Sequence, residues 1–214
     1  MAFNLSSRMF VVGLAGGSAS GKSTFSNALV TLLNTADPSL RVELISTDSY
    51  FLPNDRIPTF FSPTQARAMP DYNRPDSLDM AEFFRDLDQR CTSPQAPDVL
   101  IVEGLMVLHL PEIRERCDLR LFVELDADQR ALRRMLRNLD AHNDPIGGIN
   151  TADCIANYFL ESAKVGHDRY VEPSRKYADF ILRGDGDFIR TSKMVAGLIR
   201  SWEACKTRGS PAVN

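Results

Sequence analysis

The stretch "GLAGGSASGKSTF" (Gly13–Phe25) is the strongest indication of the fold of this chain. It matches the pattern G-x-x-x-x-G-K-[ST] through four residues, Gly16, Gly21, Lys22 and Ser23. An apolar run, "MFVVGLAG", precedes the pattern, and "KSTFSNALVTLLNTA" follows it with apolar residues at helical spacing. A flexible linker would not sit between a buried strand and an amphipathic helix. We therefore predict a loop whose backbone N–H groups surround the phosphates of a nucleotide.

Each residue type in this loop has a predicted role. Small residues allow close backbone approach, and the helix that begins here directs its positive end at the phosphates. Lys22 reaches the β and γ oxygens, and the Ser23 hydroxyl holds Mg²⁺. We predict ATP and Mg²⁺ as cofactors. The predicted nucleotide-binding residues are Gly16, Gly17, Ser18, Ala19, Ser20, Gly21, Lys22, Ser23 and Thr24.

Five apolar runs of strand length alternate with helical patterns along the chain. The runs are Met9–Gly16, Arg41–Thr47, Asp98–Gly104, Leu119–Leu125 and Ala178–Gly184. The helical patterns are Lys22–Ala36, Ser77–Arg90, Asp128–Ala141, Thr151–Tyr170 and Phe188–Cys205. This alternation predicts an α/β fold of the P-loop NTPase type, a three-layer sandwich with a parallel five-stranded sheet between helices.

The predicted organisation is one P-loop domain over residues 1–206, with a helical lid at about 128–170 and a disordered tail at 207–214. Two stretches, Phe51–Asn73 and Asn143–Asn150, are expected to be weakly structured because they are rich in turn-forming residues.

Composition and charge exclude several partners. The formal net charge is -3, which does not suit a nucleic-acid-binding surface, and no apolar run is long enough to span a bilayer. The four cysteines are scattered without metal-site spacing, which favours free thiols in a reducing cytoplasm. We expect a cytoplasmic protein with no nucleic-acid or membrane partner, and the sequence leaves open a homo-oligomer.

Signatures of other nucleotide-binding classes are missing from the sequence. The chain has no N-K-x-D stretch for guanine, no adjacent Asp-Glu at the end of its third strand, and no LSGGQ-like signature. These gaps argue against GTPase switches, motor-type ATPases and transporter ATPases. Small-molecule kinases remain the leading class.

Two carboxylates follow neighbouring strands of the predicted sheet. Asp48 comes after the second strand in "ISTDSYF", and Glu103 ends the third in "VLIVEG". A solvated turn and an edge residue would be the ordinary interpretation, but both residues should lie at the carboxyl edge beside the phosphate loop. Phosphoryl transfer needs a metal anchor and a base for the acceptor hydroxyl, and these two residues can divide the roles.

Four arginines occupy one face of the helix predicted over Asp128–Ala141. They are Arg130, Arg133, Arg134 and Arg137, at i, i+3, i+4 and i+7. One interpretation is a solvated basic stripe. The other is a lid helix that brings guanidinium groups onto the transferring phosphate, which suits their bidentate geometry. The neighbouring phosphate loop favours the lid, with only part of the row touching phosphate.

Together these pieces resemble the uridine kinase branch of the phosphoribulokinase/uridine kinase family. The resemblance runs from Phe10 to about Leu198. It is carried, in the family's order, by "GLAGGSASGKST", "STDSYF", "YNRPDSLD", "VLIVEG", "LFVELDADQRALRRMLRNL" and "YVEPSRKYADFIL". It implies transfer of the ATP γ-phosphate to the 5′-hydroxyl of a ribonucleoside such as uridine or cytidine.

The resemblance also implies roles for individual residues. Asp48 resembles the carboxylate that activates the 5′-hydroxyl, and Glu103 with Ser23 resembles the magnesium anchors. Lys22 resembles the phosphate clamp, and Arg134 and Arg137 resemble lid arginines near the phosphates and the acceptor. Phe51 and Tyr72 resemble the aromatic lining of the acceptor pocket. The loop "RGDGDF" lies where the family holds adenine.

Three departures from the family pattern bear on the acceptor. Asn73 stands where the family usually has an Asp that holds ribose hydroxyls, so we expect a weaker sugar contact. "DAHNDPIGG" replaces an Arg-Gly-Arg-like stretch. The family usually inserts a pyrimidine-recognising β-hairpin within Met80–Asp98, and this segment is too short for one. Nicotinamide riboside kinases, which lack that hairpin, kinases of other hydroxylated metabolites, and a regulatory protein without transfer activity remain alternatives.

Overall fold

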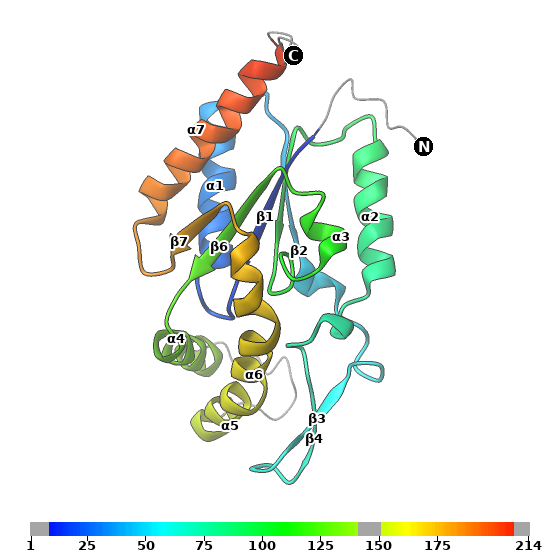
Figure 1. Cartoon of the computed structure of the whole chain (residues 1–214), viewed down its shortest axis with the longest axis vertical. Coiled ribbons are helices and arrows are strands. Elements are labelled where there is room, and N and C mark those ends of the chain that lie inside the picture. Colours follow the sequence, from blue (N-terminus) through cyan, green and yellow to red (C-terminus); the bar gives the residue numbers. More distant parts are fainter. Residues whose placement is uncertain (1–8, 141–150, 208–214) are drawn as a thin grey trace.

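The computed structural model describes residues 9–140 and 151–207. The predicted loop Asn143–Asn150 and tail residues 208–214 lie outside this range, and Thr207 forms the end of a helix. A parallel five-stranded sheet in the order β2-β5-β1-β6-β7 forms the centre of the molecule (Figure 1). Its strands are β1 (Phe10–Gly16), β2 (Val42–Ser46), β5 (Val99–Glu103), β6 (Leu119–Glu124) and β7 (Phe180–Arg183). All five predicted strands are confirmed.

Seven α-helices and several short helical turns connect the described strands. The α-helices are α1 (Lys22–Ala36), α2 (Met80–Thr92), α3 (Pro111–Arg114), α4 (Ala127–Asp140), α5 (Ala152–Tyr158), α6 (Lys164–Gly166) and α7 (Phe188–Thr207). The turns are η1 (Thr47–Tyr50), η2 (Pro75–Ser77), η3 (Phe159–Ala163), η4 (His167–Val171) and η5 (Glu172–Tyr177). Because η3 and η4 are π-helical, the single helix predicted over Thr151–Tyr170 is interrupted twice.

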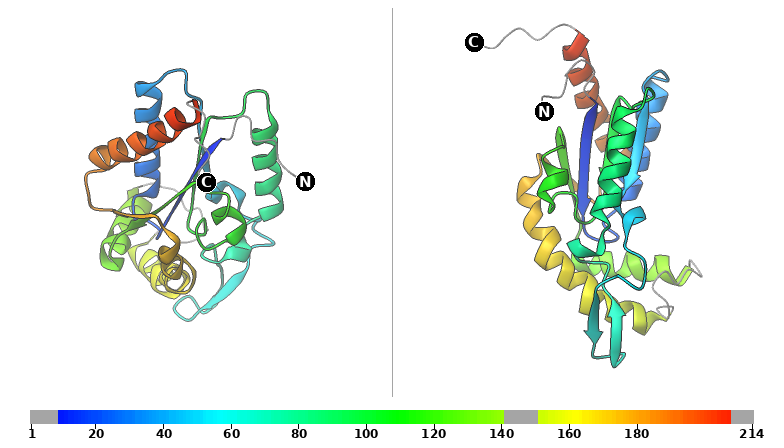
Figure 2. Two further views of the ribbon diagram at one scale, coloured as in Figure 1. Left: turned by 45° about the horizontal axis from the view of Figure 1, so that its top comes forward. Right: turned by 90° about the vertical axis from the view of Figure 1, so that its right-hand side faces the viewer.

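Alternate residues of the strands enter two separate cores, which makes the fold three-layered. Val12 and Leu14 point into the core beneath α1 and α7, whereas Ala15 points into the core beneath α2 and α3. Figure 1 and the left view of Figure 2 show α1 and α7 on one side of the strands and α2 on the other. Strands buried on both faces need continuous apolar runs, and this is why the sequence indicated them so clearly.

A β-hairpin occupies the stretch that the sequence marked as weakly structured. Strands β3 (Thr59–Ser62) and β4 (Arg67–Pro70) pair antiparallel within Phe51–Asn73, so that prediction is wrong. Met80–Asp98 contains α2 and no hairpin, as its length predicted. Pro, Ser and Thr made the hairpin look like a loop, and its turn uses Ala66 at φ 49°, a conformation that favours glycine.

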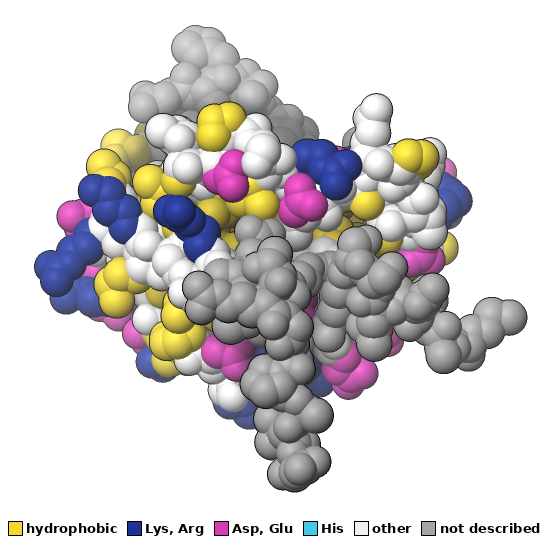
Figure 3. All heavy atoms as spheres, turned by 90° about the horizontal axis from the view of Figure 1, so that it is seen from above, with side chains coloured by type: hydrophobic (Ala, Val, Ile, Leu, Met, Phe, Trp, Pro, Cys, Tyr) yellow, Lys and Arg dark blue, Asp and Glu magenta, His cyan; other side chains and the backbone are white. Residues whose placement is uncertain are grey.

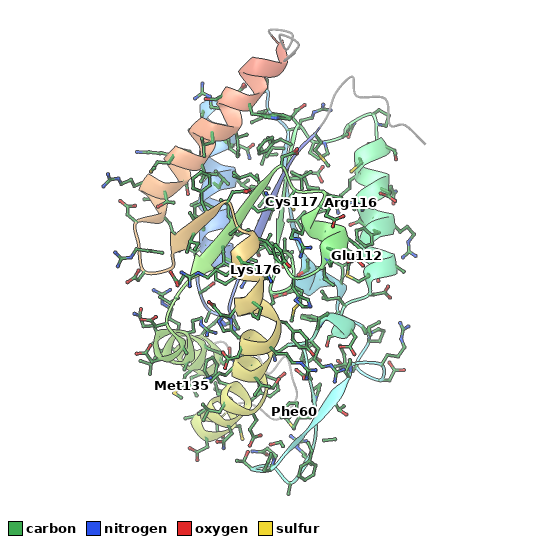
Figure 4. All side chains as sticks on the ribbon, in the orientation of Figure 1. Phe60, Glu112, Arg116, Cys117, Met135 and Lys176 are labelled. Carbon is green, nitrogen blue, oxygen red and sulfur yellow. The ribbon has the colours of Figure 1, made fainter. Side chains whose placement is uncertain are left out.

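The hairpin is stabilised by contacts with the predicted lid rather than with the sheet. A third small core joins Met69 and Phe60 of the hairpin to Met135 of α4 and to Ile155 and Tyr158 of α5. Figure 4 shows Phe60 and Met135 in this lower part of the molecule. A lone two-stranded hairpin is marginal in water, so this packing is what makes it stable.

The opposite end of the molecule has a mixed surface. Seen from that end, acidic and basic side chains alternate with apolar ones (Figure 3), in keeping with the small net charge. Across the described residues, no helix has the length and apolar character that a bilayer crossing requires.

Candidate active site

A cleft of about 910 Å³ opens at the carboxyl ends of the central strands. In Figure 1 this end of the sheet lies at the level of α4 and the β3–β4 hairpin. Ligands of open α/β sheets bind at this edge. The cleft is lined by Ser18, Ala19, Gly21, Lys22, Ser23, Thr24, Ser46, Asp48, Phe51, Tyr72, Asn73, Glu103, Gly104, Leu105, Arg133, Arg134, Arg137, Tyr158, Gly184, Asp185, Gly186 and Phe188.

The glycine loop leaves the N-terminus of α1 open toward the cleft. Gly21 precedes the helix in the left-handed region at φ 105°, and no described side chain caps it. The first turn holds no acidic residue, so the helix N–H groups keep their full positive potential. Lys22 Nζ donates to the carbonyl of Gly17 over 3.0 Å, which folds the ammonium into the loop. This arrangement suits phosphate groups.

Three of the predicted nucleotide-binding residues do not line the cleft. Gly16, Gly17 and Ser20 are not among the residues that line the cleft. Ser20 is fully buried, and Gly17 packs against the Arg130 guanidinium. Their part is to shape the loop, whereas Ser18, Ala19, Gly21, Lys22, Ser23 and Thr24 face the cleft.

Buried Glu103 and exposed Ser23 form a hydrogen-bonded pair of oxygen ligands at the base of the loop. Glu103 is 5% exposed at the end of β5. Its Oε1 accepts from the Ser23 hydroxyl at 2.9 Å, and its Oε2 accepts from Ser26 at 3.2 Å. A carboxylate and a hydroxyl, completed by phosphate oxygens and water, are the hard ligands that Mg²⁺ prefers. The donor set therefore fits the predicted metal.

Asp48 lies in the 3₁₀ turn η1, directly after β2. The Ser46 hydroxyl caps this turn by accepting from the Asp48 N–H at 3.3 Å, and the Asp48 side chain is exposed to the cleft. Burial lowers the pKa of Lys22, while the charges of Asp48 and Glu103 act in the opposite direction. Lys22 is thus within electrostatic reach of both carboxylates, as the strand-end positions predicted.

The arginine row of α4 divides into buried and exposed members. Arg130 and Arg134 are 2% and 7% exposed, and burial lowers the pKa of each guanidinium. Arg134 Nη1 donates to Ser18 Oγ of the loop at 2.9 Å, and its Nε has no partner among the described residues. Arg133 and Arg137 are exposed and line the cleft. The row is therefore not a uniformly solvated stripe.

Aromatic rings form the wall on the side of Asp48. Phe51 and Tyr72 pack edge to face with their centroids 5.0 Å apart, and both line the cleft. Tyr158 of α5 joins them, with the Arg134 guanidinium 5.3 Å from its ring. Asn73 is 5% exposed beside this wall. The structure thus brings the predicted acceptor residues into one place.

Some lining residues were missing from the sequence-based set. Tyr158 lies on a helix where spacing could not separate a site residue from a core residue, and it reaches the cleft only because α5 packs against the hairpin. Leu105 and Gly104 follow Glu103, so their place next to a predicted metal ligand was the one available signal.

Known proteins resemble this chain in sequence and in fold. The uridine kinase of Chlamydia pneumoniae is 30% identical over 83% of this chain and 82% of its own length. The uridine kinase of Deinococcus deserti is 30% identical over 91% and 97%. A solved structure titled as a possible uridine kinase from Bacillus stearothermophilus superposes with a TM-score of 0.53 at 16% identity, covering 81% of this chain and 88% of that one.

The match to a family pattern covers more than half of the chain. Residues 61–187, from the hairpin to the loop after β7, match the model of the "Phosphoribulokinase / Uridine kinase family". This range begins after the glycine loop, so the loop and its geometry are an independent observation. With the cleft, the loop and the relatives in agreement, the chain belongs to the phosphoribulokinase/uridine kinase family of phosphotransferases.

Proposed function

We propose that this protein is an ATP-dependent kinase that transfers the γ-phosphate to the 5′-hydroxyl of a ribonucleoside. One observation carries the proposal: a single cleft joins the phosphate loop to Asp48 and to the aromatic pair Phe51 and Tyr72. A phosphate donor on the loop and a flat acceptor against the rings would meet at Asp48. Curated relatives named uridine kinases support the same class of acceptor.

The donor side of the cleft has a place for each part of ATP. The phosphates would lie on the loop, near Lys22 and the free N–H groups of α1. The adenine would lie beyond them, against Phe188 and the backbone of Gly184–Gly186. Arg133 Nη1 already donates to the Gly184 carbonyl at 2.9 Å, which ties α4 to this adenine loop.

Asp48 acts on the acceptor. Its carboxylate accepts the proton of the 5′-hydroxyl as the acceptor oxygen forms a bond to the γ-phosphorus and the bond between that phosphorus and the β–γ bridging oxygen breaks. Lys22 and Arg134 would bind the phosphoryl oxygens. Burial and hydrogen bonds already hold the Lys22 ammonium and the Arg134 guanidinium in position, so little reorganisation would accompany the transfer.

Glu103 and Ser23 would hold the Mg²⁺ ion. When bound there, the ion supplies positive charge that offsets the charge on the transferring phosphoryl group. Glu103 keeps its two hydroxyl partners, Ser23 and Ser26, and these fix the orientation of its carboxylate. The division of roles between the two strand-end carboxylates is therefore Glu103 for the metal and Asp48 for the proton.

Base preference is proposed to be relaxed. Rings such as Phe51 and Tyr72 stack against any flat base, which gives affinity with little discrimination. No residue of the hairpin strands, Thr59–Ser62 or Arg67–Pro70, lines the cleft, so the hairpin supplies no contact to a base there. Uridine and cytidine should be accepted, and nicotinamide riboside should be phosphorylated measurably.

An acceptor panel tests the proposal. Purified protein is mixed with ATP, Mg²⁺ and one acceptor at a time, chosen from ribonucleosides, nicotinamide riboside, sugars and hydroxy acids, with ADP release and product mass as readouts. A ribonucleoside 5′-monophosphate is the expected product. Turnover only with a sugar or an acid would replace the ribonucleoside by that acceptor, and ATP binding without any product would favour a regulatory role.

A further inference from the structure

A buried polar cluster joins the predicted lid to the acceptor side of the cleft. Ser162 lies in the π-helical turn η3 and is 2% exposed. Its Oγ is 2.8 Å from Asp71 Oδ1 and 2.8 Å from Asn73 Nδ2. The backbone N–H of Asn73 also donates to Asp71 Oδ1, at 3.0 Å. Three side chains from two distant parts of the chain thus form one network.

The chemistry of these groups leaves one arrangement of hydrogens. A carboxylate only accepts, so the Ser162 hydroxyl donates its single hydrogen to Asp71. The lone pairs of Ser162 then accept from Asn73, and this requires the amide nitrogen, not the oxygen, to face Ser162. Among the described residues nothing donates to the Asn73 Oδ1, and Asn73 lines the cleft. The Asn73 Oδ1 atom is therefore an acceptor that no donor among the described residues occupies.

Close packing holds the lid segment over this cluster. A Cβ atom built on Gly166 would lie 2.3 Å from the backbone oxygen of Asn73 and 2.6 Å from its Cβ, so only glycine lets the helix approach so closely. Tyr158, on the preceding turn, donates to the Pro70 carbonyl at 2.9 Å. The segment that carries Ser162 is fixed on both sides of it.

We propose that Ser162, oriented by Asp71, is a positioning residue that fixes the Asn73 amide so that its Oδ1 accepts from a hydroxyl of the acceptor. This inference rests on the proposed function, since a sugar hydroxyl is the donor that Oδ1 would meet. It assigns hydroxyl discrimination to a residue of the predicted lid that does not itself line the cleft. An acceptor without that hydroxyl would leave Oδ1 unpaired and would be used less well.

The same network changes what an aspartate at position 73 would do. From the sequence, Asn73→Asp should strengthen the ribose contact by adding a charge. In the structure, the new carboxylate could not donate to Ser162 and would be buried beside Asp71, and two like charges in one site oppose each other. We therefore expect Asn73→Asp to raise the Michaelis constant for a ribonucleoside at neutral pH.

Two variants and one control test the role of Ser162. Ser162→Ala removes the partner of the Asn73 amide. Asp71→Ala removes the acceptor of the Ser162 hydroxyl, which is then free to donate to an Asn73 amide that has turned around. Ser174→Ala is the control, because Ser174 is equally buried in the following turns but donates to the Val171 carbonyl.

Hydroxyl discrimination is the first readout. The kcat/KM ratio between a ribonucleoside and its 2′- or 3′-deoxy analogue should be about 2- to 10-fold in the wild type and in Ser174→Ala, the range expected for one neutral hydrogen bond. It should approach one in Ser162→Ala and in Asp71→Ala. A ratio that survives both substitutions, or falls equally in Ser174→Ala, would overturn the proposal.

Side-chain amide exchange is the second readout, and it needs no acceptor. The Asn73 amide protons, assigned by their loss in Asn73→Asp, should exchange slowly in the wild type and in Ser174→Ala and faster in Ser162→Ala. Unchanged exchange would show that Ser162 does not hold the amide. If the wild type uses no ribonucleoside, the proposed function fails, whereas this measurement still decides the positioning role, and the kinetic comparison moves to whichever hydroxylated acceptor is turned over.

Discussion

The proposed phosphate side and the proposed acceptor side of the cleft are built in different ways. Nine consecutive residues, Gly16–Thr24, form the phosphate loop, and they do so mainly through backbone geometry and one helix terminus. The acceptor side draws Asp48 and Phe51 from the turn after β2, Tyr72 and Asn73 from the end of the hairpin, and Tyr158 from α5. One side is local in sequence, and the other is assembled from three distant segments.

Because of this difference, we expect the two sides of the cleft to respond to different substitutions. A phosphate binds to N–H groups that every residue but proline has, so the loop needs small residues at the right spacing and little else. The proposed acceptor residues act through side chains, and Tyr158 with the end of the hairpin depends on the small core of Met69, Ile155 and Tyr158. Substitutions on the loop should therefore affect ATP directly, whereas remote substitutions should affect the acceptor.

Removal of the proposed base should have the largest effect. Asp48→Asn keeps the shape of the side chain but cannot accept the proton of the acceptor hydroxyl. We expect kcat to fall about 10²–10⁴-fold, the usual contribution of a general base, with ATP affinity nearly unchanged. Steady-state turnover and calorimetry with ATP measure the two quantities, and Asp55→Asn, an exposed aspartate of the following loop, is the control. Wild-type turnover in Asp48→Asn would remove Asp48 from the mechanism.

Removal of the loop lysine should act on the donor. Lys22→Ala deletes an ammonium held within the loop by the Gly17 carbonyl. Because hydrogen bonds to charged groups contribute about 1.5–3 kcal/mol, ATP should bind roughly 10- to 100-fold more weakly. Affinity for the acceptor alone should not change. Lys193→Ala, on the exposed side of α7, should leave ATP binding as it is. Equal loss of acceptor affinity would contradict the separation of the two sides.

A core substitution far from the loop should weaken binding of the acceptor and leave binding of ATP unchanged. Met69 is 3% exposed in the core between hairpin and lid, and truncation of a buried methionine costs about 2–5 kcal/mol of packing. Met69→Ala should loosen Tyr72, Asn73 and Tyr158 and raise the Michaelis constant for the acceptor several-fold. The calorimetric affinity for ATP should stay within error. Met194→Ala, which truncates an exposed methionine of α7, should change neither constant.

The smallest expected effect is on how the free energy of unfolding depends on pH. Burial is the main cause that lowers the pKa of His167 to about 4; the charges of Arg130, Lys22 and Lys164 act in the same direction, and that of Asp168 acts against them. Its Nε2 is 3.5 Å from Glu172, and its Nδ1 is buried without a described partner. Between about pH 4 and 6.5 the unfolded chain binds more protons at this site than the folded one, so stability falls as the pH falls.

Urea unfolding checks this prediction. The free energy of unfolding should decrease between about pH 7 and about pH 5, and the decrease should be smaller in His167→Gln, which cannot bind the proton. His109→Gln serves for comparison, since burial also lowers the pKa of His109, but this residue packs on Tyr170 and the charge that acts on it is that of Arg114. Identical pH dependence in the wild type and in His167→Gln would show that His167 is not buried in its neutral form.

Features that depend on local spacing could be predicted from the amino-acid sequence. The loop Gly16–Thr24, the five strands and the strand-end places of Asp48 and Glu103 follow from runs, periods and a short motif. A strand that is buried along its whole length, such as β5, is continuously apolar up to its last residue, and parallel strands end at one edge of the sheet. Each signal lies within one short stretch of the chain, so the sequence shows it without the fold.

Features that depend on contacts between distant segments could not be predicted from the sequence. The β3–β4 hairpin has weak signals of its own and is stable because Phe60 and Met69 pack against α4 and α5. The sequence predicted that only part of the arginine row touches phosphate but not which part, and packing buries Arg130 and Arg134 and leaves Arg133 and Arg137 exposed. The orientation of the Asn73 amide is set by Ser162, far along the chain, because a hydrogen bond depends on atoms in space and not on separation in sequence.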